Sequence, residues 1–235
     1  MCTVTVVPLT SRGFRMVCNR DERRTRPRAA APRVYTTGSH DAIFPRDPVG
    51  GGTWIGANTA GLAVAVLNRN DDTCLRRSPW ELRSRGQIAI RLFECGGIDE
   101  VLEAAADLPP DRFAPFRLLA LRDHRAAIVS SNGRTLEIAE SAFENPLLLT
   151  SSSFGDQRVE SPRRALFEEL VMSSGDGWLT GQKRFHGHQW PDRPATSVLM
   201  ERSDALTVSR STIDVTERSM RFHYEALPRM ARAAW

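Results

Sequence analysis

The clearest structural signal in the chain is its first 22 residues, MCTVTVVPLTSRGFRMVCNRDE (residues 1–22). Two apolar segments, at 3–8 and 14–18, are rich in β-branched side chains and flank a turn-forming run at 10–13. This pattern predicts an antiparallel hairpin. Cys2 would lie at the start of its first strand, and a short polar run would follow its second strand.

Further strand and helix signals occur in blocks along the rest of the chain. We expect helices at 84–95, 98–107 and 161–172, the last beginning at Ser161-Pro162, and loops at 23–33 and 173–195. Parallel βαβ alternation is absent, so the sequence predicts one α+β domain over residues 1–235, in which helices cover antiparallel sheets. Besides the hairpin, the expected strands are 53–58, 62–67, 116–121, 126–130, 135–139, 146–150, 197–202, 207–210 and 220–224.

The chain has the composition of an ordinary folded protein. Its 41% hydrophobic content is too high for disorder, and no apolar run approaches the roughly 18 residues of a membrane-spanning helix. The first residues lack the basic leader and small-residue cleavage site of an export signal. The cysteines at positions 2, 18, 74 and 95 show no CxxC spacing, so we expect no metal site and a cytoplasmic protein with reduced thiols.

The positive charge is concentrated in one short segment. Lys and Arg number 32 against 28 Asp and Glu, which gives a net charge of +4. Residues 20–33 hold six arginines and two acids, so this segment alone accounts for the excess. The segment favours a small-molecule substrate or ligand with an anionic group. It has neither interleaved aromatic residues nor a recognition helix, so we do not expect nucleic-acid binding.

Cys2 is the first residue with a chemical interpretation. Removal of the initiator methionine, which is normal before a small residue, would leave Cys2 with a free α-amino group of pKa about 7.7–8.0. Part of that group is unprotonated at neutral pH, so it can serve as the base for its own thiol. The thiolate would then attack a carbonyl and form a thioester. The alternative is that Cys2 is a small apolar residue that happens to follow Met1.

Two further polar elements would complete such a site. Within Asn19-Arg20-Asp21-Glu22, a carboxylate could hold the α-amino group and the guanidinium could favour the thiolate. The alternative is a solvated charge run at a strand end. Asn68, at the end of the apolar segment 62–67, could donate its amide to an oxyanion, usually the largest single contribution in acyl transfer. Its alternative is a turn residue that opens the polar run 68–72.

Several sequence blocks, taken in order, resemble the NRDE family, which includes the eukaryotic transport-and-Golgi-organisation proteins. The same blocks resemble, more remotely, the bile salt hydrolase and penicillin V acylase group of N-terminal nucleophile hydrolases. That resemblance implies an αββα sandwich of antiparallel sheets and a catalytic cysteine exposed by removal of Met. The blocks are Met1-Cys2-Thr3, Cys18-Asn19-Arg20-Asp21-Glu22, Gly51-Gly52-Thr53-Trp54-Ile55-Gly56, Gly61-Leu62-Ala63 and Leu67-Asn68, with looser matches at Thr150-Ser151-Ser152-Ser153, Arg163-Arg164 and residues 197–225.

By position, the resemblance implies a role for each residue of the candidate site. Cys2 resembles the nucleophile and Asp21 resembles the carboxylate that holds the amine. Arg20 resembles the activating arginine, although a one-residue shift of the alignment leaves Asn19 and Glu22 as competitors. Asn68 would be the oxyanion-hole asparagine.

Two positions depart from the acylase pattern. Ser151-Ser152-Ser153 stands where the acylases have asparagine, so the second oxyanion contact would be a hydroxyl or a backbone N–H. The late arginine of the acylases has only an approximate counterpart in Arg193. A protein that keeps the family fold but has no working hydrolytic site is therefore one interpretation, beside the hydrolase and the ligand carrier described next.

The residues leave two functions in competition. The first is a hydrolase that cleaves a non-peptide amide or related acyl bond through a Cys2 thioester, with no cofactor. The second is a non-enzymatic carrier of haem or another lipophilic ligand, because some NRDE proteins are thought to move haem. His186 and His188 could ligate a metal or haem iron, but no Cys or carboxylate motif accompanies them and a polar loop is the simpler interpretation.

Overall fold

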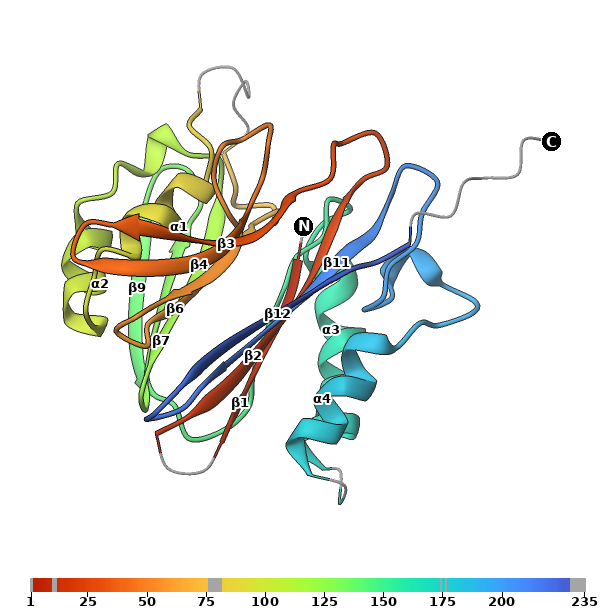
Figure 1. Ribbon diagram of the computed structural model, residues 1–235. Helices are drawn as coiled ribbons and strands as arrows, with labels where there is room; N and C mark the ends of the chain where they lie inside the picture. The colour runs from red at the N-terminus through yellow and green to blue at the C-terminus, as the bar shows by residue number, and fades with distance from the viewer. Residues whose placement is uncertain (1, 10–11, 76–81, 174, 176, 229–235) are drawn as a thin grey trace.

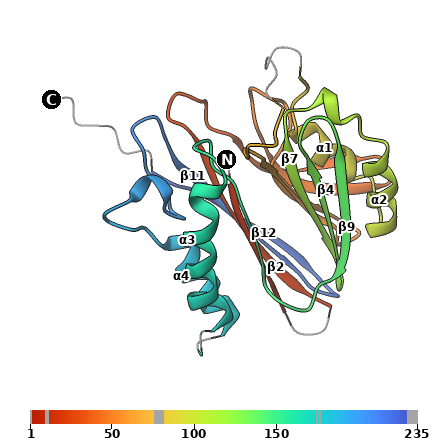
Figure 2. The same ribbon diagram turned by 180° about the vertical axis from the view of Figure 1, so that it is seen from behind.

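The computed structural model describes residues 2–9, 12–75, 82–173, 175 and 177–228. It consists of two antiparallel β-sheets that pack face to face, with helices on both outer faces (Figure 1). The view from behind shows the same four layers, with α1 and α2 on one side and α3 and α4 on the other (Figure 2). This arrangement confirms the predicted α+β sandwich.

One sheet has five strands and contains both halves of the N-terminal hairpin. The predicted hairpin is present, and its second strand sits at the centre of the sheet. The order across this sheet is β10 (Leu147–Thr150), β1 (Cys2–Pro8), β2 (Phe14–Arg23), β11 (Ala205–Val215) and β12 (Met220–Ala226).

The other sheet has seven strands that follow one another in chain order. Each strand pairs antiparallel with the next, as expected for a meander. The order is β3 (Ala30–Thr37), β4 (His40–Arg46), β5 (Ile55–Asn58), β6 (Ala63–Asn68), β7 (Phe116–Arg122), β8 (Arg125–Ser131) and β9 (Leu136–Ala142).

The helices close the two outer faces. On the seven-stranded sheet lie α1 (Gly86–Leu92) and α2 (Ile98–Ala106), followed by the 3-10 turn η2 (Pro110–Arg112). On the five-stranded sheet lie α3 (Gln157–Phe167), which continues into the π-helix η3 (Glu168–Met172), and α4 (Trp178–Gly187). A second 3-10 turn, η4 (Pro194–Thr196), follows α4.

Three clusters of buried apolar side chains fill the spaces between the four layers. Strand β6 contributes side chains to two of them, which explains why its sequence is apolar throughout. Ala63, Ala65 and Leu67 point into the cluster between the two sheets. Val64 and Val66 point into the cluster beneath α1 and α2. Both faces of the strand are therefore covered, which explains a continuous apolar run in place of alternation.

Four expectations about secondary structure were wrong. Residues 173–195 are not a loop throughout, because α4 lies within them. The helix expected from Ser161 begins at Gln157, with Pro162 inside it. No strand occupies 197–202, where the backbone forms only a single bridge from Glu201 to Leu206. Strands β3 and β4 were not expected, and β3 begins at Ala30, inside the loop expected at 23–33.

Packing explains the two largest of these errors. Gly181 lowers the helix propensity of α4, yet a Cβ there would lie 1.9 Å from the carbonyl oxygen of Leu170, so close helix packing requires the glycine. Strand β3 lies at the edge of its sheet and is largely exposed, which is why it tolerates arginine and Pro32. Neither the helix α4 nor the exposed edge strand β3 has the regular spacing of apolar residues from which helices and strands are predicted.

Within the described ranges, no helix is long and apolar enough to cross a membrane.

A buried arginine joins the five-stranded sheet to the helical layer beside it. Arg163 on α3 is 1% exposed and donates to the hydroxyls of Thr3 at 2.8 Å and Thr150 at 2.7 Å. It also donates to the carbonyl oxygens of Thr196 at 3.0 Å and Ser197 at 2.7 Å. Thr3 and Thr150 are partners across the β1–β10 pair, so Arg163 holds the strand that begins with Cys2.

We expect Arg163→Met to lower the free energy of unfolding by about 3 kcal/mol or more, because it leaves buried carbonyl and hydroxyl groups without their donor. Urea unfolding followed by circular dichroism measures this change. Arg164→Met is the matched control: Arg164 is exposed and pairs with Glu160 on its own helix, so its loss should change stability by less than about 0.5 kcal/mol. Equal losses for the two variants would contradict the role given to Arg163.

Candidate functional site

The register of the hairpin decides which side chains surround Cys2. Cys2 pairs with Arg20, and Val4 pairs with Cys18. Residues opposite one another in an antiparallel pair point to the same face, so Cys2, Cys18 and Arg20 share one face of the sheet. That face looks into the space between the two sheets.

Strand β2 extends through Arg23, so Asn19-Arg20-Asp21-Glu22 lies inside the strand and not beyond its end. The side chains therefore alternate between the two faces. Arg20 and Glu22 lie on the face of Cys2, whereas Asn19 and Asp21 lie on the face that packs against α3 and α4. The expectation of one polar cluster beside Cys2 was correct for only half of these residues.

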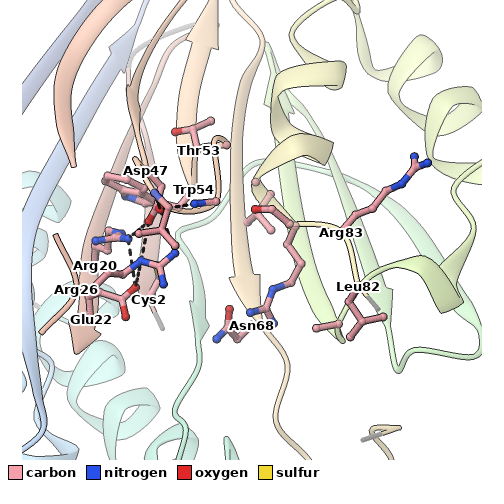
Figure 3. A pocket seen from close by; sticks show the side chains of 18 residues that line it. Cys2, Arg20, Glu22, Arg26, Asp47, Thr53, Trp54, Asn68, Leu82 and Arg83 are labelled. Carbon is pink, nitrogen blue, oxygen red and sulfur yellow. Dashed lines mark hydrogen bonds and ion pairs between the residues drawn. The ribbon is translucent and has the colours of Figure 1, made fainter. Parts of the chain in front are cut away.

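Cys2 lies at the wall of a cavity of about 680 Å³ that opens between the sheets (Figure 3). One wall carries a group of charged side chains, and Asn68 lies at the end of β6 across from it. The residues that line this cavity include Cys2, Arg20, Glu22, Arg26, Asp47, Trp54, Asn68, Arg83 and Arg85.

Arg20 is held rigidly against this wall. It is 5% exposed, and its Nη2 donates to Asp47 Oδ2 at 2.5 Å and to Glu22 Oε2 at 3.2 Å. Its guanidinium carbon lies 4.4 Å from the centre of the Trp54 ring, within the range of a cation–π interaction. The sequence predicted Arg20 and Glu22 at the site but did not predict Asp47 or Trp54 there.

Asp47 organises the charged wall. It accepts hydrogen bonds from Arg26 at 3.0 Å and from the backbone N–H groups of Val49 and Gly50 at 2.9 and 2.8 Å. Burial by itself would raise the pKa of Asp47, but the hydrogen bonds from Arg26 and Gly50 and the charge of Arg20 hold that pKa below its ordinary value. Asp47 is therefore ionised and compensates the charges of Arg20 and Arg26.

The glycine-rich run after Asp47 brings helix α1 close to the site. Gly51 has a φ of +67°, a conformation that glycine adopts without strain. A Cβ on Gly52 would lie 2.4 Å from the carbonyl carbon of Gly86, so the two backbones touch only because both residues are glycine. This contact places Arg85, next to the start of α1, at the cavity.

The Cys2 thiol is buried, 4% exposed, beside a second thiol. A side-chain hydrogen bond from Cys18 is the main cause that lowers the pKa of Cys2, and the charge of Arg20 adds to it, whereas burial and the charge of Asp21 raise it. The pKa of Cys18 is raised, chiefly by burial. Cys18 therefore stays protonated and donates to Cys2, which favours the Cys2 thiolate.

Ser151 contacts both backbone polar groups of Cys2. The nitrogen of Cys2 lies 3.1 Å from Ser151 Oγ, to which it donates. The carbonyl oxygen of Cys2 accepts from the Ser151 N–H at 3.0 Å and from its hydroxyl at 3.3 Å. The sequence suggested the serine run as a source of an oxyanion contact, which stays a prediction, and the structure places the Ser151 hydroxyl at the nitrogen of Cys2.

Asp21 and Asn19 face away from the cavity. Asp21 accepts from the Thr207 hydroxyl at 2.6 Å, and its pKa is raised by burial in spite of the nearby charge of Arg163. Asn19 is fully buried and its Nδ2 donates to the carbonyl oxygens of His186 at 2.9 Å and Val198 at 3.1 Å. Asn19 thus joins β2 to the helical layer, while Asp21 acts on Cys2 through its charge.

Two other residues singled out in the sequence lie outside this cavity. His186 is in α4, is fully buried, and its Nε2 is 2.7 Å from the Thr5 hydroxyl, so it is not part of a polar loop. Arg193 is exposed, and its guanidinium carbon lies 4.5 Å from the centre of the Trp190 ring.

Two antiparallel sheets that pack face to face between helical layers are the architecture of the N-terminal nucleophile hydrolase-like fold. Solved structures agree. The N-acylethanolamine-hydrolyzing acid amidase ortholog of Caenorhabditis elegans superposes with a TM-score of 0.57 at 11% identity, over 90% of this chain and 92% of that one. Penicillin V acylase from Agrobacterium tumefaciens superposes with a TM-score of 0.53 at 13% sequence identity, over 96% of this chain and 86% of that one. The C2A mutant of conjugated bile acid hydrolase from Clostridium perfringens superposes with a TM-score of 0.51 at 13% sequence identity, over 95% of this chain and 92% of that one.

At these identities the likeness shows a shared fold. The family itself is shown by sequence: the profile of Transport and Golgi organisation 2 matches residues 1–182, and the chain belongs to this family. No curated protein matches the chain.

Replacing Cys18 tests the contact between the two thiols. We expect Cys18→Ala to raise the pKa of Cys2, because a thiolate loses its hydrogen-bond donor, and therefore to slow alkylation of Cys2 at neutral pH. Cys18→Ser keeps an O–H donor, so its Cys2 pKa and alkylation rate should stay closer to those of the parent protein. The rate of iodoacetamide labelling of the Cys2 peptide, followed by mass spectrometry across pH, measures this. An unchanged profile in Cys18→Ala would rule out the contact as a cause.

Proposed function

We propose that this protein is a cysteine N-terminal nucleophile hydrolase that cleaves a non-peptide amide or a related acyl bond. The observation that carries the proposal is the position of Cys2: it lines a cavity beside Arg20, and its nitrogen lies 3.1 Å from Ser151 Oγ. Removal of Met1 would turn that nitrogen into an α-amino group next to the thiol. The shared scaffold with amide hydrolases supports the same chemistry.

The first half of the reaction is acylation. The α-amino group takes the proton of the Cys2 thiol, and the thiolate attacks the substrate carbonyl carbon to form a carbon–sulfur bond. The carbonyl oxygen becomes an oxyanion, towards which Asn68 would donate from the end of β6. The α-amino group then returns the proton to the leaving nitrogen, the carbon–nitrogen bond breaks, and the amine departs.

The second half is hydrolysis of the thioester. The α-amino group takes a proton from water, the hydroxide attacks the thioester carbonyl, and the carbon–sulfur bond breaks to release the acid and restore the thiol. Ser151 would hold the α-amino group in place through both halves. Arg20 would favour the anionic sulfur through its charge, while Glu22 and Asp47 fix the position of the guanidinium.

Covalent capture tests the nucleophile. We expect p-nitrophenyl acetate to add one acetyl group to the protein that lacks Met1, at the Cys2 thiol, and intact-mass spectrometry with peptide mapping measures the addition. Cys2→Ala should abolish it. Cys74→Ala is the control, because Cys74 is a partly exposed thiol away from the first cavity, and it should label like the parent. Equal labelling of the parent and Cys2→Ala would refute the proposal.

The role of Asn68 is tested by the rate of the same acylation. Loss of one oxyanion donor typically costs about 10²–10³-fold in rate, so we expect a decrease of that order in Asn68→Ala. Stopped-flow release of nitrophenolate measures the rate. Asn145→Ala removes an exposed asparagine and should leave it unchanged. A rate in Asn68→Ala within about threefold of the parent would exclude Asn68 as an oxyanion donor.

A further inference from the structure

A second cavity, of about 920 Å³, adjoins the one that holds Cys2. The two share four lining residues, which are Asn68, Leu82, Arg85 and Ala114. The cavities therefore meet at the end of β6 and the start of α1. A ligand whose reacting carbonyl lies at Cys2 can extend past Asn68 and Arg85 into the second cavity.

Of the four arginines that line the first cavity, Arg20 and Arg26 form ion pairs, whereas Arg83 and Arg85 form none with the described residues. Arg20 and Arg26 share the carboxylates of Glu22 and Asp47. In the described part of the chain, Arg85 donates to the carbonyl oxygen of Pro115 at 2.9 Å and forms no ion pair. Burial lowers the pKa of Arg85, and the nearby charges of Cys2 and Glu22 act in the opposite direction. A partly buried guanidinium without a counter-ion is costly, and an anion at its side would relieve that cost.

Unpaired donors also occur deeper in the first cavity. Arg20 Nη1 and the indole N–H of Trp54 are buried and have no hydrogen-bond acceptor among the described residues. Both residues line the same cavity as Arg85. The first cavity thus offers donors and positive charge, which suits a ligand with acceptor oxygens.

We propose that Arg85 is the binding residue for an anionic group of the substrate, a carboxylate or a group of similar charge, at the junction of the two cavities. This inference rests on the proposed function, since it places the scissile bond at Cys2. A guanidinium presents paired N–H donors that match the two oxygens of a carboxylate. Leu82 and Ala114, at the same junction, would contact the apolar part of the ligand.

Binding measured without turnover tests this inference separately from catalysis. In a Cys2→Ala background, isothermal titration calorimetry would compare N-octanoylglycine with its neutral primary amide, N-octanoylglycinamide. We expect N-octanoylglycine to bind at least about tenfold more tightly than the amide, because a charge-assisted hydrogen bond contributes a free energy of that size. Arg85→Gln should weaken binding of the carboxylate by about tenfold and leave that of the amide within about twofold. Arg85→Lys, which keeps the charge, should be intermediate.

Arg91→Gln is the matched control, because Arg91 lies in α1, the helix that Arg85 precedes, and is exposed outside both cavities. It makes the same change of net charge and should leave both affinities within about twofold of the parent. Equal affinity for the two probes, absence of saturable carboxylate binding, or equal losses in Arg85→Gln and Arg91→Gln would each overturn the inference. Failure of acetyl transfer to Cys2 would instead overturn the proposed function and leave the anion-binding result standing.

Discussion

Cys2 lies opposite Arg20 because β1 and β2 pair in a single antiparallel register, and the rest of the candidate site depends on that pairing. A shift of one residue would place Cys2 opposite Asn19 or Asp21, so that either Cys2 would turn to the helical side of the sheet or Arg20 would leave the cavity face. The register is fixed on both faces. Cys2 and Cys18 pack between the sheets, while Thr3 is held from the other side by the buried guanidinium of Arg163.

Ion pairs and an aromatic contact explain how the buried Arg20 beside Cys2 is tolerated. Arg20 is nearly inaccessible, yet two carboxylates and the face of Trp54 surround its guanidinium. Its position is therefore set by the fold and does not depend on a substrate. Arg85, next to the start of α1, forms no ion pair with an acid among the described residues. The cavity thus has compensated charge at Arg20 and charge available to a ligand at Arg85.

The sequence predicted the hairpin and the sandwich, because β-branched segments, turn residues and motif blocks are local features, and it indicated Cys2 as a candidate nucleophile, which stays a prediction. It did not predict Asp47, whose carboxylate reaches Arg20 across 27 positions of the chain. It also did not predict that Asn19 and Asp21 face away from Cys2, since that follows from where β2 ends. Helix α4 escaped prediction because Gly181 is required by contact with Leu170, a constraint that exists only in three dimensions.

The central claim is that Cys2 is activated by its own α-amino group. The most direct measurement compares the rate of acylation by p-nitrophenyl acetate for two forms of the same chain. One begins at Cys2 with a free amine, and the other carries a single glycine before Cys2. We expect fast acylation of the first form and a loss of about 10²-fold or more in the second, the usual contribution of a positioned general base. Equal rates would contradict it.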